Sequence, residues 1–149
     1  MPLVVDNEAS VFNIPRVDEQ KTPFADRCLM RKILIVDDEP SILSGLSSAL
    51  HKLCGFQGEI KTVSTGKDAI VEMYLSSYWV CFLDLELPDV GGLDVMDELR
   101  EISPETNVAI ISAGAVNDET KKTIEEKGAI FIPKPFVLSE IKTFLNRLG

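Results

Sequence analysis

KILIVDDEP, residues 32–40, is the stretch that decides the fold of this chain. Four branched aliphatic residues run directly into three acids, Asp37, Asp38 and Glu39, and a proline follows. A continuous apolar run of this length is typical of a strand that is buried on both faces of a sheet. Because proline favours the first turn of a helix, we interpret Glu39 as the residue that begins a helix. The stretch therefore predicts a buried strand that ends in carboxylates where a helix starts.

Strand-like and helical stretches alternate along the rest of the chain. Apolar strand-like runs occur at residues 32–37, 58–63, 79–84, 107–112 and 129–132, and an amphipathic stretch follows each. Strict alternation of this kind indicates an α/β domain with a parallel sheet and helices on both of its faces. Right-handed crossovers then favour a doubly wound sheet of five strands in the order 2-1-3-4-5.

The amphipathic stretches carry apolar residues at helical spacing. The first stretch places six of them on one stripe: Ile42, Leu43, Leu46, Ala49, Leu50 and Leu53. The fourth stretch, NDETKKTIEEKG at residues 117–128, offers only Ile124 as a strong apolar anchor and ends in Gly128, a residue type that caps helices. Since helices gain most of their stability from a packed apolar face, we expect this fourth helix to be weakly held and able to shift; the alternative is that it is simply an exposed helix.

The composition suits one compact domain with a short extension. The chain has 149 residues, of which 45% are hydrophobic, and a formal net charge of −9. An acidic chain is a poor match for nucleic acid, because phosphate binding depends on clustered Lys and Arg. The three cysteines form no CxxC pair, and no apolar run reaches the roughly 18 residues that a membrane span needs. We therefore expect a cytoplasmic protein without membrane insertion and without nucleic-acid binding of its own.

Residues 1–31 differ from the rest of the chain. They mix prolines, charges and scattered apolar residues without a helical or strand period. We interpret them as an N-terminal extension, partly disordered or draped on the body, and residues 32–149 as the folded domain.

Polar side chains gather at the carboxyl ends of four predicted strands. The first strand ends in Asp37 and Asp38, the third in Asp84, the fourth in Ser112 and the fifth in Lys134. In an open parallel sheet these ends share one edge, where ligands bind. Three neighbouring carboxylates raise a pKa or recruit a cation, and oxygen ligands without His or Cys suit Mg²⁺. A carboxylate nucleophile, a metal, a lysine and a hydroxyl are the parts of an aspartyl-phosphate site.

Four motifs in order, ILIVDDEP, CFLDLELPDVGGLDVM, VAIISAG and FIPKPF, resemble the receiver domain of bacterial two-component response regulators. The resemblance covers residues 32–149, and its motifs are specific when taken together. It implies a flavodoxin-like fold, which agrees with the pattern of strands and helices. No effector domain follows residue 149, so we expect a stand-alone regulator similar to the chemotaxis receivers.

The resemblance also implies roles for individual residues. Asp84 resembles the phosphoacceptor. Asp38 and Asp84, with the backbone carbonyl of Glu86, would ligate Mg²⁺, and Asp37 would hold the metal through water. Lys134 would pair with Asp84 at rest and with the phosphoryl group afterwards.

Three further positions match the part of the family that responds to phosphorylation. Ser112 would hydrogen-bond a phosphoryl oxygen and be drawn inward, and Phe131 stands at the aromatic switch position behind it. Lys134–Pro135 is expected to be a cis peptide. Serine replaces the more frequent threonine at position 112, and Phe131 lacks the hydroxyl of a tyrosine. An output contact that needs this hydroxyl is therefore excluded.

These roles imply a response regulator that accepts a phosphoryl group on Asp84 from a sensor histidine kinase or a histidine phosphotransfer protein. Phosphorylation would switch a surface that docks an unknown downstream protein. Such a chain is not an enzyme in the usual sense, but a phosphoacceptor that catalyses its own phosphoryl transfer and slow dephosphorylation. The alternative is a constitutive interaction module on the same fold that is not phosphorylated. A flavin or nucleotide carrier is disfavoured, because neither a GxGxxG nor a GxxxxGK[ST] loop occurs.

Overall fold

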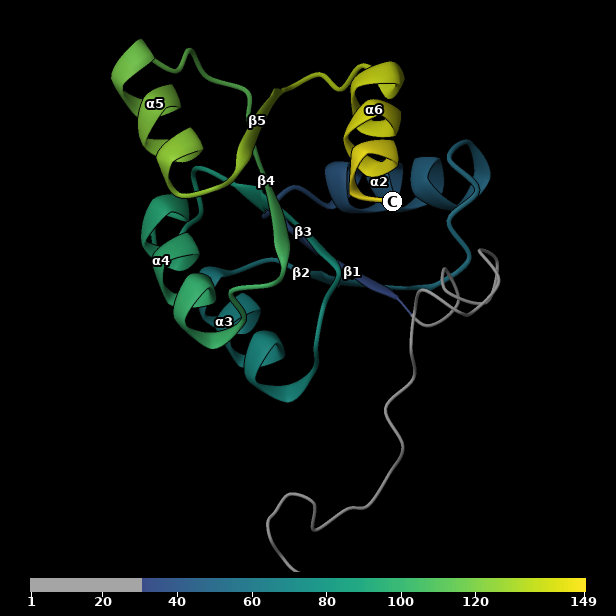
Figure 1. Ribbon diagram of the computed structural model, residues 1–149, viewed down its shortest axis with the longest axis horizontal. Helices are drawn as coiled ribbons and strands as arrows, with labels where there is room; N and C mark the ends of the chain where they lie inside the picture. Colours follow the sequence, from purple (N-terminus) through teal and green to yellow (C-terminus); the bar gives the residue numbers. More distant parts are fainter. Residues whose placement is uncertain (1–30) are drawn as a thin grey trace, which may run out of the picture.

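The structure, a computed structural model, describes residues 31–149, and strands and helices alternate through this range (Figure 1). The described strands are β1 (Lys32–Val36), β2 (Glu59–Val63), β3 (Val80–Asp84), β4 (Asn107–Ser112) and β5 (Ile130–Pro133). The described helices are α2 (Pro40–Lys52), α3 (Gly66–Leu75), α4 (Gly92–Ile102), α5 (Asp118–Glu126) and α6 (Leu138–Leu148). Each predicted strand is confirmed to within one residue at either end.

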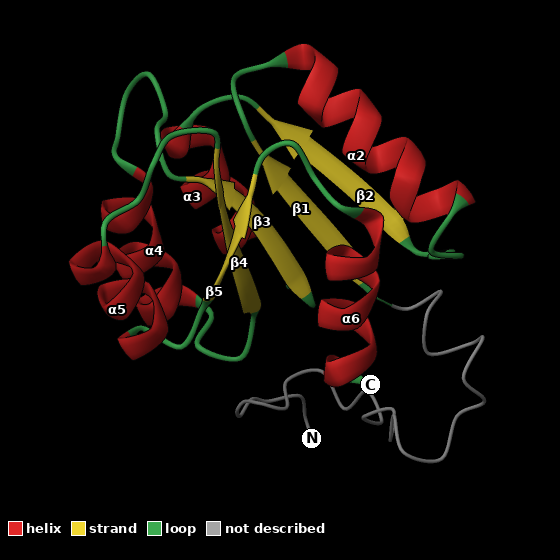
Figure 2. Cartoon of the chain, turned by 90° about the horizontal axis from the view of Figure 1, so that it is seen from above, coloured by secondary structure: helices red, strands yellow, loops and turns green. Residues whose placement is uncertain are grey.

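All neighbouring strands pair in parallel, in the order β2-β1-β3-β4-β5. The predicted doubly wound sheet is therefore confirmed. Helices α2 and α6 cover one face, and α3, α4 and α5 cover the other (Figure 2). The predicted extension at residues 1–31 lies, apart from Arg31, outside the described residues.

Alternate residues of the central strands build a core on each face. Leu34 and Val36 of β1 join the core under α3, α4 and α5, whereas Ile33 and Ile35 join the core under α2 and α6. Burial on both faces explains why the central strands are continuously apolar.

The structure differs from the sequence prediction at two places, in the burial of the edge strand β2 and at the end of helix α2. β2 has the sequence EIKTV and is largely exposed, because only one of its sides is paired and its outer residues meet solvent. Leu53, which was placed on the apolar stripe, lies just past the end of α2 and is 58% exposed. Apolar residues at helical spacing do not show where the helix ends.

Helix α5 matches the prediction of a weakly anchored helix. Ile124 is its one buried residue, and the chain leaves it through Gly128, whose φ of +81° lies in the left-handed region that favours glycine. Among the described helices, none is long and apolar enough to cross a membrane.

Candidate functional site

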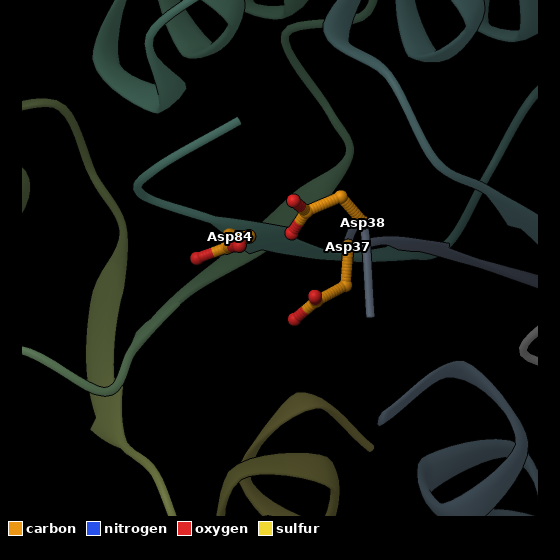
Figure 3. Close-up of side chains that lie close together, drawn as sticks. All are labelled: Asp37, Asp38 and Asp84. Carbon is orange, nitrogen blue, oxygen red and sulfur yellow. The ribbon is translucent and has the colours of Figure 1, made fainter. Parts of the chain in front are cut away.

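The register of the sheet brings the acids at the strand ends together. Val36 of β1 pairs with Leu83 of β3, so the next residues, Asp37 and Asp84, lie level with each other at the carboxyl edge. The side chains of Asp37, Asp38 and Asp84 point into one space (Figure 3), and each offers a carboxylate oxygen within 4.8 Å of the others. The predicted meeting of these three acids is therefore present in the structure.

Asp37 is the most enclosed of the three acids. Its side chain is fully buried, and Oδ1 accepts a hydrogen bond from the backbone N–H of Glu39 at 2.9 Å. Oδ2 has no partner in good hydrogen-bond geometry, but the ammonium of Lys134 lies 2.6 Å away and neutralises its charge. Asp38, by contrast, is exposed and faces the solvent side of the cluster.

Lys134 follows β5 and reaches across the edge of the sheet. Its side chain is only 7% exposed, and its ammonium lies 2.6 Å from Asp37, 3.4 Å from Glu39 and 3.8 Å from Asp84. Burial disfavours the charged amine, but the close ion pair with Asp37 and the negative charge of Asp84 outweigh this effect and raise the pKa of Lys134. The expected partner at rest was Asp84, whereas the closest carboxylate is that of Asp37.

Asp84 is buried at the end of β3, and its charge is costly there. Burial raises the pKa of Asp84 to about 6; the charges of Asp37 and Asp38 act in the same direction. The backbone N–H of Glu86, which donates to Oδ1 at 3.2 Å, and the Lys134 ammonium act against this rise. A carboxylate that is poorly solvated and only partly neutralised is well suited to react with an electrophile.

The loop after β3 holds Asp84 through two residues to which sequence analysis gave no role. Gly92 begins α4 against the end of β3, and a Cβ at this position would lie 2.5 Å from the carbonyl oxygen of Asp84. Asp89 accepts hydrogen bonds from the backbone N–H groups of Gly66 and Lys67, at 2.8 and 3.0 Å, and so ties the loop to α3. Asp89 and Gly92 both lie in the sequence LPDVGG, but their roles become visible only in the packing of the loop.

Ser112 lies on β4, the strand beside β3, and Phe131 lies on β5, the next strand along the sheet. Ser112 ends β4, is 3% exposed, and accepts a hydrogen bond at Oγ from the backbone N–H of Gly114 at 3.2 Å. Its carbonyl oxygen accepts a hydrogen bond from the backbone N–H of Lys134 at 2.8 Å, which fixes the backbone of Lys134 beside the end of β4. Phe131 is half-buried against the core under α5, and the Lys121 ammonium lies 5.8 Å from its ring centre.

Two further predictions concern the residues around Lys134. The Lys134–Pro135 peptide is cis, as expected. Glu39 is the N-cap residue of α2, as its position predicted, but its side chain makes no capping hydrogen bond; its carboxylate instead reaches Lys134 at 3.4 Å. The contact was not foreseen, because it joins residues far apart in the sequence.

The cluster fits a divalent cation. Its donors are carboxylate oxygens, with no His or Cys among the three residues, and hard cations such as Mg²⁺ prefer such ligands. Lys134 offsets part of the charge of the three carboxylates, which leaves room for a second positive charge. The donor chemistry and the close approach of the acids therefore suit the metal predicted from the sequence.

Fold and site together define a doubly wound α/β domain with an acidic pocket and a lysine at its carboxyl edge. The sequence matches the family model of the response regulator receiver domain over residues 33–146. The chain belongs to this family of receiver domains.

Individual relatives support the assignment. The photosynthetic apparatus regulatory protein RegA of Rhodobacter capsulatus is 34% identical over 127 residues, which cover 85% of this chain and 67% of RegA. The probable transcriptional regulatory protein TcrX of Mycobacterium tuberculosis is 32% identical over 122 residues, covering 78% of this chain and 50% of TcrX. The signal receiver domain of a putative Luxo repressor protein from Vibrio parahaemolyticus has a TM-score of 0.72 at 28% identity, covering 79% and 88% of the two chains.

Most of these curated relatives are longer than this chain. The match spans about half the length of TcrX and of the transcriptional regulatory protein PrrA of Mycobacterium leprae. The similarity therefore concerns the receiver domain, and the output of the whole protein is a matter for proposal.

Proposed function

We propose that this receiver domain accepts a phosphoryl group on Asp84 from the phosphohistidine of a sensor histidine kinase or a histidine phosphotransfer protein. One observation carries the proposal: Asp37, Asp38 and Asp84 meet within 4.8 Å, and Lys134 lies 3.8 Å from Asp84. Nucleophile, metal-binding oxygens and a fixed positive charge are thus gathered in one place.

The transfer balances without a further reactant. The Asp84 carboxylate attacks the phosphorus, an O–P bond forms, and the P–N bond to the donor imidazole breaks. The bonding electrons leave with the imidazole nitrogen, which takes up a proton. Burial weakens the solvation of the Asp84 carboxylate and so lowers the cost of bringing it to the phosphorus.

Residues around Asp84 would carry the charge of the transferred group. Asp38, Asp84 and the carbonyl of Glu86 would hold Mg²⁺, with Asp37 acting through water. When bound, Mg²⁺ supplies positive charge to the phosphoryl oxygens. The backbone of Lys134 is fixed by its hydrogen bond to Ser112, and its ammonium would move from Asp37 toward these oxygens.

The response to phosphorylation is proposed to pass through Ser112 and Phe131. A phosphoryl oxygen at Asp84 would compete with Gly114 for the Ser112 hydroxyl. The space vacated by Ser112 would let Phe131 turn inward, and α5 would follow because only Ile124 anchors it in the core. This change would alter a surface that docks a downstream protein.

The finer aspects of the function stay predictions. The chain would be a phosphoacceptor that catalyses its own phosphorylation and slow dephosphorylation, not an enzyme acting on a separate substrate. A stand-alone role and a cytoplasmic location are parts of the same proposal.

Mass spectrometry of the intact protein tests the proposal. The protein is mixed with acetyl phosphate and Mg²⁺, and we expect a mass gain of one phosphoryl group. Asp84→Asn should abolish the gain, and a chelator should suppress it. No gain with several small phosphoryl donors would instead favour the alternative, a constitutive interaction module on the same fold.

A further inference from the structure

The outward face of α3 exposes three large apolar side chains. Val71, Tyr74 and Leu75 are 52%, 71% and 73% exposed, and their spacing of three and four residues places them on one side of the helix. The core side of α3 is already filled by Ala69 and Met73. These three residues, here called the α3 patch, contribute little to the core, and apolar patches of this kind mark interaction sites.

Opposite charges lie at the two ends of the α3 patch. Lys67 lies one turn before Val71 on the same side of α3, near its N-terminus. At the other end, Glu98 and Glu101 of α4 line a hollow of about 530 Å³ together with Tyr74. Within residues 31–149, the ammonium of Lys67 and the carboxylates of Glu98 and Glu101 have no ion-pair partner.

This arrangement is self-complementary. We propose that the α3 patch binds the α3 patch of a second copy of this chain, with the two α3 helices antiparallel about a two-fold axis near Val71. Because the axis passes near Val71, the α3 helices of the two copies run in opposite directions, and the apolar residues of one α3 patch face those of the other. The axis also places Lys67 of each copy opposite Glu98 and Glu101 of the other, so that each contact occurs twice.

Charge complementarity favours a second copy over other partners. A uniformly basic partner would satisfy Glu98 and Glu101 but leave Lys67 facing like charge, and an acidic partner would do the reverse. The net charge of −9 opposes association in general, so a dimer requires this kind of local matching. Figure 2 shows α3 and α4 on the face opposite α2 and α6.

The interface is small, so the dimer is expected to be weak. A helix of 10 residues is about 15 Å long, which is less than the span of a standard interface. We expect a dissociation constant of roughly tens to hundreds of micromolar in low salt, and weaker association in high salt.

Analytical ultracentrifugation of the full chain over this concentration range tests the proposal with two charge variants. In Lys67→Glu, the reversed residue faces the acids of a second copy; in Glu98→Lys/Glu101→Lys, the reversed residues face Lys67. Each variant alone should dimerise at least about tenfold more weakly than the unmodified protein. An equimolar mixture of the two variants should form a heterodimer. In it, Glu at position 67 of one copy faces Lys at positions 98 and 101 of the other, and Lys67 of the second copy faces Glu98 and Glu101 of the first.

The variants are not expected to harm folding. All three side chains are exposed, and an acid in the first turn of α3 is favoured by the helix dipole. Tyr74→Ser should also weaken the dimer, with an unchanged melting temperature as the control. The proposal is overturned if the protein is monomeric at all concentrations, if the charge variants dimerise as before, or if mixing them fails to restore association.

Discussion

The ammonium of Lys134 lies 2.6 Å from the buried Oδ2 of Asp37, so one ion pair closes the carboxyl edge of the sheet between β1 and β5. Both side chains are nearly removed from solvent, at 7% and 0% exposure. The ion pair holds the lysine beside Asp84 without neutralising that carboxylate fully. In this structure the Lys134 ammonium is therefore paired with Asp37, while it remains close to the carboxylate of Asp84.

Removing this lysine should destabilise the protein. Lys134→Met leaves Asp37 without its charge partner and is expected to lower the free energy of unfolding by about 3 kcal/mol in metal-free buffer. Urea unfolding measures the change. Lys32→Met is the matched control, because its ion pair with Glu59 is exposed and should be worth less than about 1 kcal/mol. Equal losses in the two variants would contradict the role of the buried pair.

The raised pKa of Asp84, about 6, gives the stability of the protein a pH dependence of definite sign. Below the unfolded value of 3.8 the carboxyl is neutral in both states. Between pH 3.8 and about 6 the unfolded carboxyl loses its proton while the folded one keeps it, so the destabilisation grows over this range and stays at its full value above about pH 6. Asp84→Asn should therefore raise the melting temperature by a few degrees at pH 7 in a chelating buffer.

The gain from Asp84→Asn should shrink as the pH falls toward 4. Thermal melts over this range measure it, and Glu86→Gln, which changes an exposed carboxyl, should have little effect at any pH. A stabilisation by Asp84→Asn that stayed constant with pH would show that the charge of Asp84 is not its cause.

Gly92 offers a test of how closely α4 packs against the reacting strand. In Gly92→Ala the new Cβ would meet the backbone of Asp84 and Leu85 at 2.5 to 2.8 Å, so we expect a loss of about 2 kcal/mol and slower phosphorylation. Gly45→Ala in α2 is the control, since nothing lies within 4 Å of its Cβ; it should stabilise by about 0.5 to 1 kcal/mol. Similar effects of the two changes on stability would contradict this packing.

Ser112 is expected to act on the phosphoryl group and not on the fold. Ser112→Ala removes a hydroxyl that only accepts a hydrogen bond from Gly114, and phosphorylation should slow by about tenfold or more. The rate of mass gain with acetyl phosphate measures this effect. Ser112→Thr, which keeps the hydroxyl, should retain the rate, and a slow threonine variant would argue for a packing role instead.

The order of the strands and the meeting of the acids were predictable, because each polar residue directly follows a buried strand. Strand ends in a parallel sheet share one edge, so position along the chain is enough to bring Asp37 and Asp84 together. The pairing of Lys134 with Asp37 instead of Asp84 was not predictable. The ammonium lies 2.6 Å from Asp37 and 3.8 Å from Asp84, and the conformation of a long side chain decides so small a difference. The exposure of β2 was missed although the predicted strand order places β2 at an edge, because its sequence, EIKTV, was grouped with the apolar runs of the central strands.

The central claim is that Asp84 is the residue that accepts the phosphoryl group. Its most direct test is to phosphorylate the protein with acetyl phosphate and Mg²⁺, reduce the acyl phosphate with borohydride, and locate the resulting homoserine by peptide mass spectrometry. The account predicts homoserine at position 84 alone. Homoserine at position 37 or 38, or at none of the three, would contradict it.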